Sequence, residues 1–406
     1  MSAFGALRGR NYQLWAGGAL VSNIGAWMQR TAQDWIVLAE LTHKDARALG
    51  LVMALQFAPQ LLLLPLTGWA ADHLNRRKLL LATQATMGLL ALVLGLLVIT
   101  HRVRLWEVDV LAFLLGCVTA FDAPARQTFV SELVDEADLP SAVALNSTSF
   151  NAARMVGPAL AGVLIAAVGS GWVFLLNAAS FLAVIGSLLL LSKRRLRGGD
   201  KPRPGRSALI DGFRYVWGRP DLRTLLTMLF LIGTFGMNYP IFISTMSVSV
   251  FHAGAGQFGL LTSTMALGSV SGALMAARRG KPDMRLPSLA AGAFGLGFAI
   301  AAVMPNYALF GVALVAVGFS AQTFTTSINA LVQLSTEPAM RGRVMAILLA
   351  VALGGTPLGA PLVGWIAHTA GPRWALAVAA LAGLGAAAFG LRAGAARSPE
   401  PVPSAP

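Results

Sequence analysis

At residues 68–78 the chain reads GWAADHLNRRK. This short polar and basic segment joins two apolar runs, at 49–71 and 78–100. Each run is as long as the roughly 20 residues that a helix needs to cross a hydrocarbon core about 30 Å thick. We therefore expect residues 68–78 to form a loop between two membrane-spanning helices.

The composition extends this expectation to the whole chain. Of the 406 residues, 56% are hydrophobic and 12% are charged, whereas a soluble domain carries about 25% charged residues. A water-soluble or disordered protein is therefore excluded, and an all-α polytopic membrane protein is predicted. The twelve expected transmembrane helices are 13–40, 49–71, 78–100, 107–129, 143–168, 172–192, 224–248, 256–278, 287–304, 307–333, 344–368 and 374–391.

The distribution of Lys and Arg predicts how these helices are oriented. With the N-terminus in the cytoplasm, 24 basic residues fall on the cytoplasmic side, five fall on the outer side and two lie within spans. Because basic residues gather in the cytoplasmic loops of membrane proteins, both termini are expected in the cytoplasm. The net charge of +14 has the same explanation, so no nucleic-acid partner is expected.

A basic loop divides the chain into two halves. We expect an N-terminal six-helix bundle at 1–192, a cytoplasmic linker at 193–222, a C-terminal six-helix bundle at 223–391 and a disordered tail at 392–406. Within the linker, residues 208–217 carry apolar side chains near helical spacing, which fits an interfacial helix on anionic headgroups. A plain solvated linker explains the same basic residues.

The two halves repeat each other at an offset of 202 residues. The matching pairs are Gly116 with Gly318, Gly157 with Gly359, Gly162 with Gly364, Gly169 with Gly371 and Trp172 with Trp374. Duplicated six-helix halves are an architecture of secondary transporters, whose substrates bind near the middle of the bilayer between the repeats. A channel or a membrane enzyme has less need of this symmetry.

The loop at 68–78 resembles the signature of the major facilitator superfamily. The positions that match the signature are Gly68, Asp72, Arg77 and Lys78. His73 stands where the superfamily usually has Arg or Lys, and Asn75 stands where it usually has Gly. Because Asn tolerates a left-handed backbone nearly as well as Gly does, we expect the turn to be preserved.

Two further segments are similar to one branch of that superfamily. FDAPAR at 121–126 closes span 4, and ALNS at 144–147 with NAARMVGPALAG at 151–162 forms span 5. These segments resemble the enterobactin-exporter-like branch of bacterial efflux proteins, the transmembrane secretion effectors. The resemblance implies a secondary active transporter, a proton-coupled exporter of a small amphipathic molecule such as a drug, siderophore or metabolite, working by alternating access.

The resemblance also implies a monomer in the bacterial inner membrane. Its expected partners are a small-molecule substrate, protons and the lipid bilayer, and no cofactor is expected. An importer of the same fold is the alternative, followed by a membrane channel. An enzyme is not expected, because Cys117 is alone, the five histidines are isolated in sequence and no GxxxxGK[ST] loop for ATP is present.

The loop at 68–78 is also expected to act as a latch, as it does in the superfamily. Its acidic residue would approach the N-terminal end of span 11, where the helix dipole favours an anion. One of its arginines would reach a carboxylate on span 4, and such contacts would bias a conformational equilibrium. Ordinary loop charges that set topology are the alternative. The expected latch residues are Gly68, Asp72, Arg76, Arg77, Asp122 and Arg126.

Ionisable residues within spans 1 and 5 point to the functional site. Arg30 and Asp34 lie four residues apart on one face of span 1, and Arg154 lies near the middle of span 5. Two guanidinium groups beside one carboxylate suit an anionic substrate group, and a partly buried carboxylate can exchange a proton. For Asp34, a structural ion pair and a place at the outer interface are the alternatives. The predicted proton-coupling or substrate residues are Asp34, Arg30, Gln33, Arg154 and Asn151.

Span 5 also carries a stretch similar to a motif of the superfamily's antiporters, formed by Gly157, Pro158 and Gly162. Proline within a helix is expected to kink or loosen it near mid-membrane. Small residues favour a close approach between helices. The resemblance implies that this stretch seals the transporter against leakage.

Overall fold

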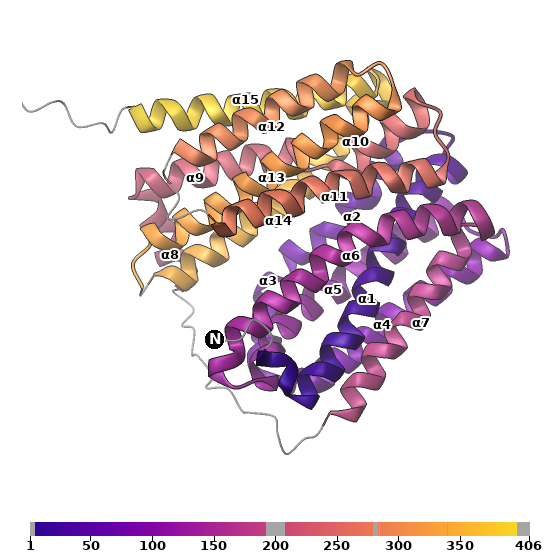
Figure 1. The fold of residues 1–406 in the computed structure, drawn as a ribbon, viewed down its shortest axis with the longest axis horizontal. Helices are drawn as coiled ribbons and strands as arrows, with labels where there is room; N and C mark the ends of the chain where they lie inside the picture. The colour runs from indigo at the N-terminus through magenta and orange to yellow at the C-terminus, as the bar shows by residue number, and fades with distance from the viewer. Residues whose placement is uncertain (1–4, 192–207, 279–282, 284, 339, 396–406) are drawn as a thin grey trace, which may run out of the picture. The chain divides into compact units, whose positions relative to one another are not determined.

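The computed structural model describes residues 5–191, 208–278, 283, 285–338 and 340–395, without the side chains of residues 65, 68, 69, 71, 72, 208–210, 277, 394 and 395. All regular elements in this part of the chain are helices (Figure 1). Helices are what a bilayer demands, because every backbone N–H and C=O within it needs an internal partner. The all-α class predicted from composition is therefore confirmed.

The helices of the first half follow the predicted spans closely. A 3₁₀ turn at Gly5–Arg8 precedes α1, and another at Glu136–Asp138 precedes α6. The α-helices are α1 (Arg10–Trp35), α2 (Ala46–Leu62), α3 (Leu64–His73), α4 (Arg76–Ile99), α5 (Leu105–Leu133), α6 (Leu139–Val168) and α7 (Ser170–Leu190). The helix α1 continues without a break into a π-helical segment, Ile36–Leu41.

The second half begins with a short helix and continues with the predicted spans. Its α-helices are α8 (Ala208–Trp217), α9 (Pro220–Leu231), α10 (Tyr239–Thr245), α11 (Ala255–Arg278), α12 (Arg285–Val303), α13 (Tyr307–Ser335), α14 (Arg341–Thr369) and α15 (Pro372–Ala395). Two π-helical segments, Ile232–Gly236 and Met246–Val250, follow α9 and α10. The first span of each half thus ends in a π-helical segment.

Two spans that we predicted as continuous helices are interrupted. The segment 49–71 divides at Leu63 into α2 and α3, and the segment 224–248 divides near Asn238 into α9 and α10. A proline lies at the start of each following helix, Pro65 in α3 and Pro240 in α10. Proline has no N–H to donate, and the first turn of a helix is where that loss costs nothing.

Polar N-cap residues precede several helices, in the short connections between predicted spans. Asn75 has an extended backbone, and its side chain accepts a hydrogen bond from the N–H of Lys78 at 3.1 Å as the N-cap of α4. The left-handed turn that we expected at Asn75 is therefore absent, because capping satisfies a free N–H of the helix. Asp45 caps α2 in the same way and also binds the Arg47 guanidinium, which lowers the pKa of its carboxyl.

The repeat predicted from the sequence is visible in the backbone. Gly169 follows α6 with φ 93°, and Gly371 follows α14 with φ 105°. These two glycines form one of the matching pairs at the offset of 202 residues, and each precedes the last helix of its half. A side chain at either position would strain the left-handed backbone, so both turns need glycine.

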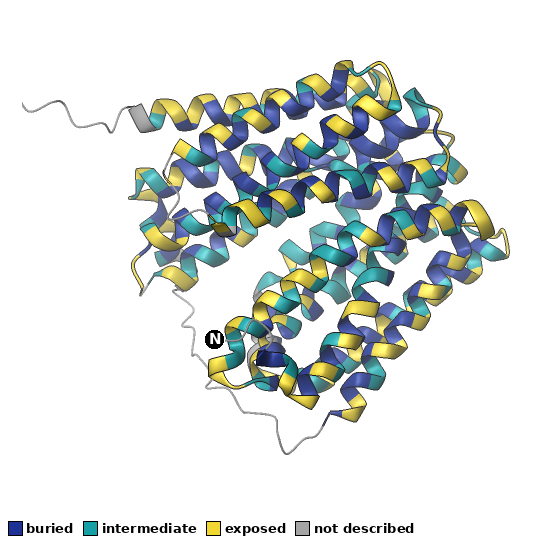
Figure 2. Cartoon of the chain, in the orientation of Figure 1, coloured by how far each residue is buried: buried dark blue, intermediate teal, exposed yellow. Residues whose placement is uncertain are grey.

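The helices carry the exposed apolar surface of a membrane protein. Among the described residues, ten helices are long and apolar enough to cross a membrane. The remaining two of the twelve expected spans contain α1, whose polar residues lower its hydropathy, and α2, which is apolar but shorter. Leu182 and Leu381 are 66% and 70% exposed, and exposed residues follow the outer faces of the helices (Figure 2). Such a surface belongs in lipid, so the chain is a multi-pass membrane protein.

The contacts group the chain into two compact units. The first comprises 1–203, 239–266 and 360–372, and the second comprises the rest. In the first unit, α1 packs against α6 and α7, α4 packs against α5 and α7, and α2 packs against α5 (Figure 1). The division into bundles at 192 and 223 stays a prediction. The first compact unit adds α10, the first half of α11 and the last part of α14 to the first half of the chain.

A helix is present at the residues predicted to lie on the membrane surface. Within the second unit, the Asp211 carboxylate of α8 lies 3.5 Å from the Arg343 guanidinium of α14. Phe213 and Trp217 are exposed, at 54% and 72%, whereas Val216 is buried. Contact of this helix with lipid headgroups stays a prediction. The rest of the predicted linker up to residue 207 and the tail from residue 396 lie outside the described residues.

Candidate functional site

Two glycines bring α1 close to α7 and thereby hold the polar face of α1 in place. A Cβ atom at Gly18 would lie 2.9 Å from Ser187 Oγ, and one at Gly25 would lie 2.5 Å from Ser180 Oγ. Small residues allow such close packing between helices in a membrane. One turn further along α1, Asn177 Nδ2 of α7 donates a hydrogen bond to Gln29 Oε1 at 2.5 Å. This bond fixes the register of the two helices.

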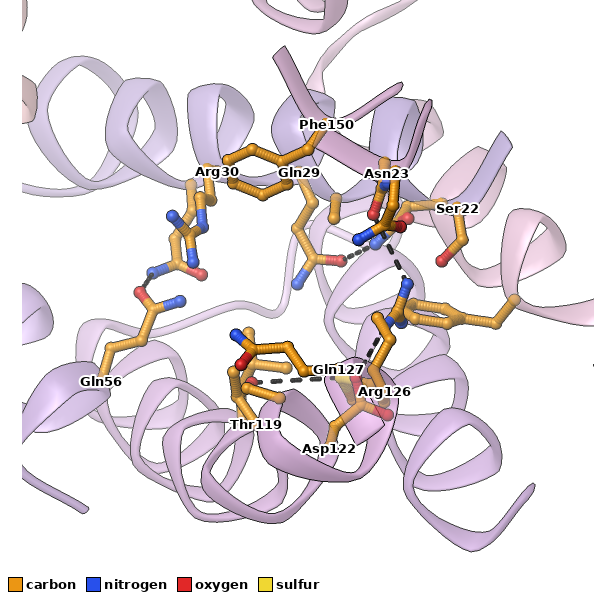
Figure 3. Close-up of a pocket in the computed structure, with 18 of the residues that line it drawn as sticks. Ser22, Asn23, Gln29, Arg30, Gln56, Thr119, Asp122, Arg126, Gln127 and Phe150 are labelled. Atoms are coloured by element: carbon orange, nitrogen blue, oxygen red, sulfur yellow. Dashed lines mark hydrogen bonds and ion pairs between the residues drawn. The ribbon is translucent and has the colours of Figure 1, made fainter. Parts of the chain in front are cut away.

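The polar face of α1 lines a cavity of about 420 Å³ within the first unit. Residues of α1, α2, α4, α5, α6 and α7 surround the cavity, and Figure 3 shows many of them pointing into it. Amides predominate among its polar groups, and Gln33 Nε2 donates to Gln56 Oε1 at 3.2 Å across the space between α1 and α2. The amide-bearing residues of the wall are Asn23, Gln29, Gln33, Gln56, Gln127, Asn146, Asn151 and Asn177.

Asp122 supplies the one carboxylate among the described residues that line the cavity, and three neighbours engage it. Its Oδ1 accepts hydrogen bonds from Thr83 Oγ1 and Gln84 Nε2, each at 2.7 Å. Its Oδ2 accepts one from Arg126 Nε at 3.1 Å. A buried charge without partners costs several kcal/mol, and these three donors offset that cost. Arg126 extends the network to Asn23 Oδ1 of α1 at 3.5 Å.

Arg30 is held differently from Arg126. Its guanidinium carbon lies 5.1 Å from the ring centre of Trp27 and 5.9 Å from that of Phe57. The faces of aromatic rings attract a cation without accepting all of its N–H groups. The opposite charge of Asp34 acts on Arg30, but no hydrogen bond joins the Arg30 guanidinium to any described residue. In Figure 3, Arg30 lies at one side of the cavity and Arg126 at the other.

Arg154 of α6 lies on the same aromatic platform as Arg30. Its guanidinium carbon is 5.9 Å from the ring centre of Trp27, which also makes an edge contact with Phe150 at 5.7 Å. Its charge acts on Arg30 and on Tyr239 of α10, within the same unit. Arg154 therefore adds positive charge near Arg30, as the sequence led us to expect.

The structure places the predicted site residues in two groups. Arg30, Gln33 and Asn151 line the cavity, whereas Asp34 and Arg154 stand beside it and act through charge. The predicted set of site residues does not contain Gln29, a polar residue of span 1, or the amides of α2, α5 and α7, which also line the cavity. Amide side chains in otherwise apolar spans are costly to bury, so their presence alone was a usable signal. In the described part of the chain, no group of three or more His, Cys, Asp or Glu side chains is placed to hold a metal ion.

The arginines of the loop at 68–78 contact partners other than the one we predicted. Arg76 Nη1 pairs with Glu132 Oε1 at 2.5 Å, and Arg77 Nη2 donates to the Leu189 carbonyl at 3.1 Å. The predicted partner Asp122 lies inside the bundle, where Thr83, Gln84 and Arg126 engage it, while Glu132 lies at the end of α5 nearer to the loop. The side chain of Asp72, like the surroundings of Gly68, lies outside the described residues.

The antiporter-like stretch of α6 makes very close contacts within the first unit. A Cβ atom at Gly157 would lie 2.6 Å from Trp27 Cβ of α1, and one at Gly162 would lie 2.7 Å from the Ala255 carbonyl of α11. Pro158 lies within α6, which continues as one helix through it. In the repeat, a Cβ atom at Gly364 of α14 would lie 2.5 Å from the Ala46 carbonyl of α2.

Known proteins share this fold over almost the whole chain. A bacterial homologue of the human lysosomal transporter spinster, in an inward-facing conformation, superposes with a TM-score of 0.77 at 14% identity, over 95% of this chain and 97% of that one. A POT family transporter in complex with 5-aminolevulinic acid gives the same TM-score at 10% identity, over 95% and 96%. The chain thus has the major facilitator fold.

Curated relatives match nearly full length and are transporters. The staphyloferrin A transporter of Staphylococcus aureus is 26% identical over 86% of this chain and 87% of its own length. The multidrug efflux pump Tap of Mycolicibacterium fortuitum is 28% identical over 87% and 88%. The enterobactin exporter EntS of Shigella flexneri is 28% identical over 80% and 77%. The chain is accordingly a transporter and not an enzyme.

A family profile described as "Transmembrane secretion effector" matches residues 1–400. The match confirms the branch that the segments at 121–126 and 151–162 indicated. The chain therefore belongs to the transmembrane secretion effector family of the major facilitator superfamily.

Proposed function

We propose that this protein exports a small amphipathic molecule across the bacterial inner membrane, in exchange for protons and by alternating access. The observation that carries this proposal is the cavity of about 420 Å³, whose polar wall lies within apolar helices. Polar groups are expensive to place inside a membrane, and those that are found there mark substrate and ion pathways. The names of the relatives, which include exporters of a siderophore and of drugs, support export rather than import.

Asp34 is the proposed proton carrier. It lies on α1 one turn from Arg30, whose charge acts on it, and it does not belong to the described lining of the cavity. A carboxylate in this position can take up a proton without blocking the space that the substrate occupies. Proton binding at Asp34 would change the charge balance around Arg30, which lies one turn away on α1. We further propose that the protein works as a monomer with both termini in the cytoplasm.

Reconstitution into proteoliposomes tests the function directly. The assay follows three fluorescent probes that differ in charge: the cation rhodamine 6G, the neutral N-phenyl-1-naphthylamine and the anion 8-anilino-1-naphthalenesulfonate. We expect saturable transport of at least one probe, and a gradient of one pH unit should drive an about tenfold accumulation of that probe, which an uncoupler abolishes. Single-channel currents, or flux that is insensitive to the gradient, would contradict an exchanger and favour a channel.

The latch is a separate part of the proposal. Asp72 is proposed to bind the N-terminal end of α14 in one conformational state, where helix N–H groups attract an anion. Asp72→Asn removes the negative charge and keeps the shape of the side chain, so transport should fall about tenfold while membrane insertion stays normal. The measurement is transport per molecule of inserted protein, with the loop variant His73→Asn as its control. Transport at the wild-type rate in Asp72→Asn would leave the loop with only a topological role.

A further inference from the structure

We infer that the substrates of the cavity carry an anionic group, and that this group binds the Arg30 guanidinium. The inference deepens the proposed function and rests on it, since it names the substrate class of the same site. Three features of the cavity wall support it. Hydrogen bonds occupy the carboxylate of the wall, the Arg30 guanidinium offers open donors, and the charges around Arg30 favour an anion.

The wall offers no open carboxylate to a cationic substrate. Among the described lining residues, Asp122 alone carries a carboxylate, and hydrogen bonds from Thr83, Gln84 and Arg126 occupy both of its oxygens. A cation approaching Asp122 would have to displace Arg126, which binds from the next turn of the same helix. Among the described lining residues, a positively charged substrate therefore finds neutral amides, hydroxyls and aromatic faces, but no open carboxylate.

Arg30, in contrast, offers open donors to the cavity. Its guanidinium lies against the rings of Trp27 and Phe57, which leave its N–H groups without a hydrogen-bond acceptor among the described residues. A guanidinium presents its N–H groups in a planar fork that matches a carboxylate or sulfonate. The ring contacts hold the fork in position before a ligand arrives, which reduces the entropy lost on binding.

The charges around Arg30 favour an anion as well. Arg154 shares the Trp27 platform and adds a second positive charge, and Asp34 supplies one negative charge from the next turn of α1. The three groups together carry a net charge of +1 when Asp34 is ionised and +2 when it holds a proton, so in both states they attract an anion and repel a cation. The amide of Gln33 is a neutral donor nearby, and Phe150 and Phe181 supply apolar wall for the body of a ligand.

A matched pair of probes tests this inference. The anion 8-anilino-1-naphthalenesulfonate and the neutral N-phenyl-1-naphthylamine share one ring system and differ in the sulfonate. Binding is measured by fluorescence to the full-length protein in lipid nanodiscs, with empty nanodiscs subtracted. We expect the wild-type protein to bind the sulfonate at least about tenfold more tightly than the neutral probe, because a charge-assisted hydrogen bond contributes more than that factor.

Variants of Arg30 then locate the anion. Arg30→Gln should weaken binding of the sulfonate about tenfold or more and change binding of the neutral probe less than about twofold. Arg30→Lys keeps the positive charge but lacks the planar set of N–H donors. We therefore expect it to bind the sulfonate more tightly than Arg30→Gln does and less tightly than the wild-type protein does. Arg47→Gln, at an exposed ion pair outside the cavity, is the control and should change neither.

The outcomes separate this inference from the proposed function. Wild-type protein that binds rhodamine 6G or the neutral probe as tightly as the sulfonate would overturn the anionic class, even if transport is driven by protons. An equal loss of both probes in Arg30→Gln would overturn the role of Arg30. Selective sulfonate binding without gradient-driven transport of any probe would support the anion site and overturn the proposed function. The comparison on wild-type protein stands even if Arg30→Gln fails to fold.

Discussion

Asp34→Asn is expected to abolish the part of transport that a proton gradient drives. Asparagine has nearly the shape of aspartate but takes up no proton, so the variant should exchange substrate only down the substrate's own gradient. A gradient of one pH unit is worth about 1.4 kcal/mol per proton, so an about tenfold accumulation of substrate should disappear. The measurement is probe accumulation in proteoliposomes at several imposed pH gradients, together with the proton flux that the probe induces.

The reason to single out Asp34 is its position. It interacts with Arg30 through charge and lies on α1, in a predicted span, outside the described cavity lining. Asp122, the other carboxylate near the cavity, accepts hydrogen bonds from three donors. Asp122 therefore fits a structural role better, because the bonds from Thr83 and Gln84 join α4 to α5.

Glu40→Gln is the matched control for Asp34→Asn. Glu40 lies on the same span, beyond Asp34, and accepts a hydrogen bond from Ser170 Oγ at 3.1 Å. The same loss of one carboxylate at this position should leave proton coupling unchanged. If Asp34→Asn lowers the thermal stability but keeps substrate-induced proton flux at the wild-type ratio, Asp34 is a structural partner of Arg30 and the proton role is refuted.

Gly162→Leu is expected to reduce transport about tenfold or more while the protein still inserts into the membrane. A Cβ atom at Gly162 would lie 2.7 Å from the Ala255 carbonyl and 3.0 Å from Gly256 Cα of α11. Both are backbone atoms, so no side chain can rotate away and the two helices must separate. Overpacking of this kind costs about 1–3 kcal/mol, which depopulates the conformation in which α6 and α11 touch by about fivefold to more than a hundredfold.

Controls for this prediction come from glycines that face open space. A Cβ atom at Gly186 of α7, or at Gly385 of α15, would meet nothing within 4 Å. Gly186→Leu and Gly385→Leu should transport at close to the wild-type rate. Gly364→Leu, at the repeat position in α14, should reproduce the defect, since its Cβ would lie 2.5 Å from the Ala46 carbonyl. Normal transport in both Gly162→Leu and Gly364→Leu would show that the close contacts are not required for the cycle.

The loop at 68–78 illustrates how far the sequence carries. Its place between two spans and its basic character followed from composition. The loop that we predicted at 68–78 is shorter than expected, because α3 continues to His73 and α4 begins at Arg76, which leaves Leu74 and Asn75 as the link. The hydrogen-bond partners of this segment could not be predicted from its sequence. The sequence pointed to Asp122 as the partner of an arginine of the loop, whereas Glu132 is the partner of Arg76, because Asp122 lies among donors deeper in the bundle. Asn75 likewise caps a helix instead of forming a left-handed turn.

What the sequence determined by itself was the class, the spans and the repeat. The class and the spans depend on hydropathy summed over about 20 residues, and the repeat depends in part on glycines that a tight turn requires. Each apolar segment forms a helix because the backbone groups within a bilayer need internal hydrogen-bond partners. The interior of the site was decided by tertiary structure. Whether Gln29, Gln56 and Asn177 face lipid or other amides depends on how α1, α2 and α7 cross. Gly18 and Gly25 set one of these crossings through contacts with residues of α7 that are more than 150 positions away in sequence. A polar side chain in an apolar span needs a hydrogen-bond partner, and this need can be read from the sequence. Which partner it has is determined by the packing of helices that are distant in sequence.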